Sequence, residues 1–337
     1  MKRVAFLSAI WAATVLAALT FGASSLGLSE VFSLIGAKLP GVSRWAGQAP
    51  ESSSVIFFDI RLPRVLLAGL VGASLALAGT ALQGLFRNPM ASPYVLGISA
   101  GAALGAVVAL IGRIDFAIPF LPAVPLVAFG GALAATLLVY SLARIKGRVP
   151  VATLLLAGIA MGSFLSAVVS MILVFSEESV ANVLFWLMGG LSSADWSGLT
   201  LVIPYFIAGV CMLIYSTREL NALLLGEEAS KHLGIDVERL KRRLLFATSL
   251  LTAAAVAVTG IIGFVGLIVP HIVRLIVGPD HRLLIPLAGL SGAILLTVMD
   301  TLARSVLTQE VPVGVISALL GAPFFIYLLR KHRAGIF

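Results

Sequence analysis

The sequence predicts an all-α protein, a polytopic transmembrane helical bundle of about ten spans with both termini in the cytoplasm. Of its 337 residues, 60% are hydrophobic and 11% are charged. A soluble domain usually has about a quarter charged residues, so this chain has too little charge to cover a surface that faces water. The mean hydropathy of +1.09 agrees with this. We therefore expect a single transmembrane domain over residues 1–337, surrounded by a lipid bilayer.

Ten apolar runs divide the chain, and a membrane helix needs about 20 mostly apolar residues. The runs cover residues 4–26, 62–86, 93–112, 119–143, 150–175, 197–216, 243–262, 265–277, 283–305 and 312–330. The eighth run is short. Glycines recur at a spacing of four in the third run, at Gly97, Gly101 and Gly105, and in the fifth, at Gly158 and Gly162. Small residues at this spacing let helices approach closely, so they favour a packed bundle.

The first run also has the pattern of a secretory signal peptide. Lys2 and Arg3 precede it, and small residues at 23–25 follow it. Because the rest of the chain is membrane protein as well, we expect this run to be retained as the first span.

Charged residues alternate in sign between successive loops, which indicates the orientation. One set of loops contains Lys2, Arg3, Arg87, Arg144, Lys146, Arg148, the basic residues from Arg218 to Arg243, Arg282, Arg330, Lys331 and Arg333, and the other contains Glu51, Asp59, Asp115, Glu177, Glu178, Asp195 and Glu310. The positive-inside rule places the basic set in the cytoplasm. Both termini then lie inside, which ten spans satisfy. Topology thus explains the net charge of +8, and we expect no nucleic-acid partner.

Two loops are long. Residues 27–60 would lie outside and form a short periplasmic cap, whereas residues 217–242 would lie inside. Breaks at Gly226 and Gly234 predict two short helices in the inner loop. This loop is either a solvated connector or a docking surface, and the leucines at 223–225 favour docking because they need a partner to cover them.

The chain has none of the common catalytic patterns. It contains no glycine-rich phosphate loop ending in Gly-Lys-Ser/Thr, no nucleophile elbow and no histidines or cysteine at metal-ligand spacing. We therefore expect no enzyme activity, no bound metal and no ATP hydrolysis by this chain itself.

A few ionisable residues border the apolar runs, where charge is costly and usually has a function. Arg61 and Arg64 lie on one helix face at the outer start of the second run. Arg304 lies at the outer end of the ninth, and Asp300 precedes it at the spacing of a helix ion pair. The arginines either snorkel and pair locally or form a positive outer rim that captures an acidic partner.

Several motifs occur in an order that resembles one family of membrane proteins. They are Arg61-Leu62-Pro63-Arg64, the segment from Gln83 to Ala91, Gly226-Glu227-Glu228-Ala229, the segment from Gly263 to His271, Asp280-His281-Arg282, and the segments from Pro312 to Val315 and from Gly321 to Pro323. From about residue 59 onward the sequence resembles the iron-chelate, haem and cobalamin permeases, the membrane subunits of type II ABC importers.

The resemblance implies a homodimer with two cytoplasmic ABC ATPase subunits and a periplasmic or lipid-anchored substrate-binding protein. ATP and magnesium would bind to the ATPase, and this chain would hold no cofactor. Arginines that match Arg61, Arg64 and Arg304 receive glutamates of the binding protein in this family, which would favour encounter and orientation.

The resemblance also assigns the inner loop and a gate. Coupling helices that enter the ATPase match Leu223, Leu224, Leu225, Glu227, Glu228, Ala229, Ser230, Lys231, His232 and Leu233. The inner gate matches Asn88, Met90, Val151 and Ala152. The cobalamin permease has hydroxyl side chains at the last two positions and this chain has none, so the constriction would be apolar and could close by dewetting.

These features together predict a permease that moves an iron chelate, a ferric siderophore, across a bacterial or archaeal inner (plasma) membrane by alternating access. The same importer type carrying cobalamin or haem is the alternative. A stand-alone secondary transporter is a more distant one, since it would need a coupling-ion site and Asp300 is the main candidate.

Overall fold

The fold is all-α, as the sequence predicts. The computed structural model describes residues 2–22, 26–38, 50–116, 122–176, 180–305 and 309–333. Its elements are α1 (Lys2–Thr20), α2 (Leu28–Lys38), α3 (Glu51–Val55), the π-helical turn η1 (Ile56–Arg61), α4 (Leu62–Leu85), the 3₁₀ turn η2 (Pro93–Leu96), α5 (Ile98–Ile111), α6 (Ala123–Ala143), α7 (Val151–Val174), α8 (Val180–Met188), α9 (Trp196–Tyr215), α10 (Thr217–Leu223), α11 (Glu227–His232), α12 (Val237–Thr259), α13 (Val265–Val277), α14 (His281–Ser305) and α15 (Val313–Arg333).

Each of the ten apolar runs corresponds to a helix, but only some helices have the length of a full span. Within the described residues, seven helices are long and apolar enough to cross a membrane, and α5, α13 and α15 are among the shorter apolar ones. The number of spans and the orientation therefore stay predictions. The predicted outer loop 27–60 is wrong at its C-terminal end, because helix begins at Glu51 and continues into α4. Residues 39–49 of that loop, and Glu177 and Glu178, lie outside the described residues.

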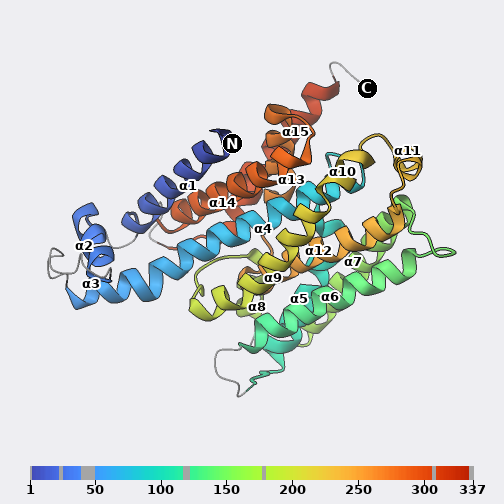
Figure 1. The fold of residues 1–337 in the computed structure, drawn as a ribbon. Helices are drawn as coiled ribbons and strands as arrows, with labels where there is room; N and C mark the ends of the chain where they lie inside the picture. Colours follow the sequence, from blue (N-terminus) through green and yellow to red (C-terminus); the bar gives the residue numbers. More distant parts are fainter. Residues whose placement is uncertain are drawn as a thin grey trace.

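Helix α4 is the centre of the bundle, and α9, α12, α13 and α14 pack around it (Figure 1). Glycines permit this close packing. A Cβ atom on Gly72 would lie 2.2 Å from the carbonyl oxygen of Gly292 in α14, and one on Gly79 would lie 1.7 Å from that of Gly266 in α13. Neither position has room for a side chain, so any larger residue there would push the neighbouring helix away from α4.

The glycine ridges predicted in the third and fifth runs are present in part. Gly101 and Gly105 lie against the backbone of α6, and Gly158 lies against the carbonyl of Val95. Gly162 faces open space instead, so the sequence spacing correctly indicated close contact at only some of these positions.

Different short helices lie at the two ends of the bundle. Figure 1 shows α10 and α11 at one end, with both chain termini directed toward it, and α2 and α3 at the other. We call the first the coupling end and the second the outer end.

Candidate functional site

The three arginines singled out in the sequence come together at the outer end of the bundle. Arg64 donates from Nε and Nη2 to Oδ1 of Asp300 at 3.0 and 2.8 Å, and it forms an ion pair with Glu310 through Nη1. The Nε atom of Arg304 lies 3.6 Å from Oδ2 of Asp300, which is the pair that the spacing of four predicts. Asp300 is only 1% exposed, so two arginines neutralise a carboxylate that has almost no access to solvent.

Arg61 and Arg304 also hold the end of the first helix. Arg61 Nη1 donates to the carbonyl oxygens of Leu19 and Thr20 at 2.8 and 3.0 Å, and Arg304 Nη2 donates to that of Ala18. These are carbonyls at the C-terminus of α1, which lack partners within the helix and carry the negative end of its dipole. The arginines thus anchor α1 to α4 and α14.

The three arginines are buried in the single subunit, whereas an open positive rim would expose them to solvent. In the single subunit Arg61, Arg64 and Arg304 are 4%, 9% and 9% exposed. Local pairing, the alternative that the sequence left open, is therefore present in this structure. Among the described residues, Asp300 and Glu310 pair with Arg64, and Glu310 is the more accessible of them, with a side chain 38% exposed.

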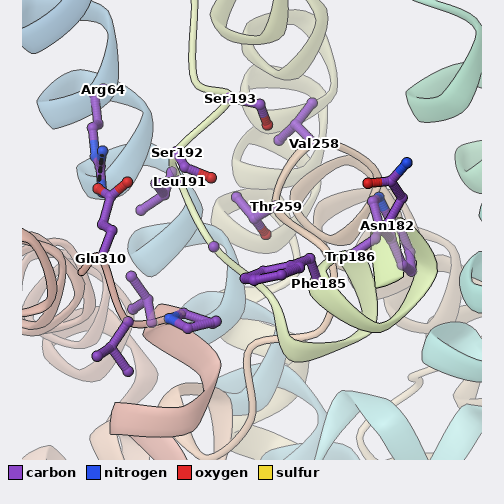
Figure 2. A pocket seen from close by; sticks show the side chains of 14 residues that line it. Arg64, Asn182, Phe185, Trp186, Leu191, Ser192, Ser193, Val258, Thr259 and Glu310 are labelled. Carbon is purple, nitrogen blue, oxygen red and sulfur yellow. Dashed lines mark ion pairs between the residues drawn. The ribbon is translucent and has the colours of Figure 1, made fainter. Parts of the chain in front are cut away.

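A cavity of about 430 Å³ lies beside this cluster. Figure 2 shows Arg64 and Glu310 on one side of it and the rings of Phe185 and Trp186 from α8 on the other. Ser192, Ser193, Asn182 and Thr259 add polar groups to the lining. Sequence reasoning missed α8 because nine mostly apolar residues are too few for a span and the run shows no other helix signal.

The two short helices predicted in the inner loop are α10 and α11, with the break at Gly226. Leu225 and Leu233 are 69% and 63% exposed, and Glu228, Lys231 and His232 are exposed as well, while Leu224, Glu227 and Ala229 are half-buried. The prediction that leucines 223–225 need a partner is wrong for Leu223, which is fully covered within the chain. Ser230 is also buried, and its hydroxyl donates to the carbonyl of Gly226. Docking would therefore use the remaining, accessible positions.

A buried lysine that the sequence did not single out connects α11 to the start of α7. Lys241 Nζ lies 2.9 Å from Oε1 of Glu227 and 3.2 Å from Oε1 of Glu238, and it donates to the carbonyl of Val149 at 3.2 Å. The backbone N–H of Val149 in turn donates to Oε2 of Glu238 at 3.0 Å. Lys241 is 4% exposed, whereas the side chains of Glu227 and Glu238 are 39% and 28% exposed, so a buried cation pairs here with two partly exposed carboxylates. Glu227 and Lys241 are 14 positions apart, a separation that gave no sequence signal for the pair.

The predicted gate residues lie at the coupling end. Val151 and Ala152 begin α7, two residues after Val149. Asn88 and Met90 lie in the turn after α4, where the amide oxygen of Asn88 accepts from the backbone N–H of Met90 at 2.9 Å. This turn is close to the inner loop, because a Cβ atom on Gly226 would lie 3.5 Å from Nη1 of Arg87.

A second polar link joins the inner loop to α14. The amide of Asn221 in α10 donates to Asp280 Oδ1 at 2.6 Å and accepts from the backbone N–H of His281 at 2.8 Å. Hydrogen bonds from the backbone N–H of Arg282 and from Asn221 lower the pKa of Asp280 below its usual value, so it is ionised at neutral pH. A movement of α10 would thus be passed to the first residues of α14.

Similarity to known proteins identifies the family of this chain. The profile of the FecCD transport family matches residues 10–331. The chain belongs to that family. It is 50% identical over 284 residues to the cobalamin import system permease protein BtuC of Halobacterium salinarum, covering 84% of this chain and 76% of that protein. It is 44% identical over 295 residues to the hemin transport system permease protein HmuU of Yersinia pestis, covering 86% and 87%.

A solved structure agrees along almost the whole chain. An inward-facing structure described as a metal-chelate type ABC transporter superposes with a TM-score of 0.85 at 30% identity, covering 98% of this chain and 99% of that one. This FecCD protein is therefore a permease subunit of a type II ABC importer and a multi-pass membrane protein, and the ATP hydrolysis of such importers takes place on separate subunits.

Proposed function

We propose that this FecCD permease works as a homodimer and imports an iron chelate, a ferric siderophore, across the inner (plasma) membrane of a bacterium or archaeon by alternating access. Two ATPase subunits that hold ATP and magnesium would bind the coupling end, and a substrate-binding protein would dock on the outer end. The observation that carries the proposal is the whole-chain similarity to a metal-chelate type ABC transporter.

The outer cavity fits one half of a translocation pathway. Its volume of about 430 Å³ lies within the range of small-molecule sites, about 300–1,000 Å³, but a metal chelate is a large ligand. A second copy of the chain would complete the path. Helices α7 and α15 offer apolar faces for that copy, since Ile159 and Phe164 are 59% and 63% exposed and Leu319 is 69% exposed.

Cobalamin is the second candidate, because the relative at 50% identity is named as a cobalamin import permease. The apolar pair Val151 and Ala152 at the predicted gate is our reason to place a ferric siderophore first. A secondary transporter is disfavoured, since Asp300 is bonded to Arg64 and lies beside Arg304 and so is not available to a coupling ion.

Reconstitution tests the proposal and identifies the ligand. Proteoliposomes that contain the permease and its ATPase should take up ligand only when ATP and the binding protein are both supplied. A thermal-shift screen of the binding protein should show a rise in Tm with ferric siderophores and a smaller one, or none, with cobalamin and haem, because a ligand that binds only the folded state stabilises it. Uptake without the ATPase would contradict the importer, and a shift with cobalamin alone would replace the siderophore.

Docking at the arginine cluster predicts a specific effect of Glu310. A carboxylate of the binding protein would have to take the place of Glu310 on Arg64 Nη1, because Asp300 already occupies Nε and Nη2. The change Glu310→Gln should therefore tighten docking several-fold at low salt, with a smaller gain at high salt as screening weakens the pairing. Binding-protein affinity measured on nanodiscs checks this, and Glu51→Gln, at the outer end but outside the cluster, is the control. Unchanged or weaker docking would argue against Arg64 as the contact.

A further inference from the structure

A long apolar groove runs along α4 between α9 and α14. It consists of two adjoining cavities of about 590 and 370 Å³, which share Ala73, Phe206, Gly289 and Leu290. Alanine and glycine form part of the floor and so leave space, and aliphatic residues of α9 and α14 form the walls. Polar atoms contribute little to this lining, so the groove offers an apolar ligand a continuous surface.

The two ends of the groove differ in chemistry. Arg218 and Arg282 line it at the coupling end, and Trp11 of α1 lines it at the far end. Along α14 it extends from Arg282 to Ala293, which is about 16 Å at 1.5 Å per residue. The hydrocarbon core of a bilayer is about 30 Å thick. The groove thus has the length of one leaflet, with cations where the headgroups of that leaflet lie.

Both guanidinium groups are available to a ligand. Arg218 and Arg282 are exposed, and within the part of the chain that the structure describes neither forms a side-chain ion pair. Asp280 lies two residues before Arg282, but its carboxylate already accepts hydrogen bonds from Asn221 and from the backbone N–H of Arg282. Two cations without a dedicated counter-ion, at the mouth of an apolar groove, complement an anionic headgroup followed by an acyl chain.

We propose that this groove binds one anionic phospholipid of the cytoplasmic leaflet, with its phosphate between Arg218 and Arg282 and an acyl chain along α4 toward Trp11. The leaflet follows from the orientation in the proposed function, on which the inference rests. Anionic lipids are enriched in that leaflet. The headgroup would contact α10 and α14 together, next to the link between Asn221 and Asp280.

Native mass spectrometry of the full-length permease, released from nanodiscs of equal phosphatidylglycerol and phosphatidylcholine, tests the lipid site. The wild-type protein should retain phosphatidylglycerol in preference to phosphatidylcholine. The double change Arg218→Gln with Arg282→Gln should lower this preference roughly tenfold or more, since each basic group near the membrane surface contributes about 1 kcal/mol to anionic-lipid binding. The change Leu290→Trp should fill the groove and reduce retention of both lipids.

A matched pair of arginines distinguishes this site from a general effect of positive charge. Arg144→Gln with Arg148→Gln removes two exposed charges of another loop at the coupling end and should leave the lipid preference unchanged. Equal retention of the two lipids by the wild-type protein would overturn the proposal whatever the variants do. Displacement of the lipid by millimolar inorganic phosphate would show that the site binds anions in general, and this result would also overturn the proposal. No ATPase or binding protein takes part, so a failed transport assay would leave this result unaffected.

Discussion

Replacing Lys241 with methionine should uncouple ATP hydrolysis from transport. Methionine keeps an unbranched side chain of similar length but cannot bond Glu227 or the carbonyl of Val149, which Lys241 now joins at 2.9 and 3.2 Å. The start of α7, where the predicted gate lies, would then lose its polar connection to α11. A coupling free energy of about 1–3 kcal/mol corresponds to roughly 5–150-fold, so we expect ligand uptake to fall tenfold or more while ATP hydrolysis persists.

The ratio of ATP hydrolysed to ligand imported, measured in proteoliposomes, checks this expectation. Merely structural damage would lower both rates together, whereas loss of coupling raises the ratio. Arg239→Met is the matched control, because Arg239 is a basic residue of the same helix with a side chain 69% exposed and paired only loosely with Asp236 at 3.6 Å. It should leave the ratio unchanged. If Lys241→Met kept the wild-type ratio of ATP hydrolysed to ligand imported, Lys241 would contribute packing alone and no coupling.

Removing the carboxylate of Asp300 should strongly destabilise the subunit. Arg304 would lose the buried carboxylate with which it pairs, and Arg64 would retain only its pair with the more exposed Glu310. Breaking a buried ion pair from one side costs about 3–5 kcal/mol, because an uncompensated charge stays in a poorly hydrated site. We expect Asp300→Ala to lower the free energy of unfolding by about this amount and to loosen the end of α1, which Arg304 holds.

Glu310→Gln gives the comparison for this experiment, since Glu310 pairs with the same arginine but its side chain is 38% exposed against 1% for Asp300. Exposed ion pairs contribute about 0–1 kcal/mol, so this change should hardly alter unfolding. Denaturation of the purified subunit in detergent micelles, followed by circular dichroism, measures both variants. Equal effects of the two changes would show that burial does not set the strength of this cluster.

Composition and motifs determined the class of this protein. A chain with 11% charged residues has too little charge to cover a surface that faces water. Each of its apolar runs corresponds to a helix, although some boundaries differ by five or six residues and the helix of the second run begins earlier, at Glu51. The arginines 61, 64 and 304 and the break at Gly226 were also visible, because membrane borders and helix ends make charge and glycine informative.

Only the tertiary structure decided which of these groups meet and which stay accessible. Arg64 and Asp300 are 236 positions apart, and Glu227 and Lys241 lie on separate helices, so no local spacing could pair them. The burial of Leu223 and the groove ending at Arg218 and Arg282 depend equally on neighbours from distant segments. Hydrophobicity along the chain fixes which segments enter the membrane, whereas burial and ion pairing depend on how the helices pack, which the close approach at Gly72 and Gly79 sets.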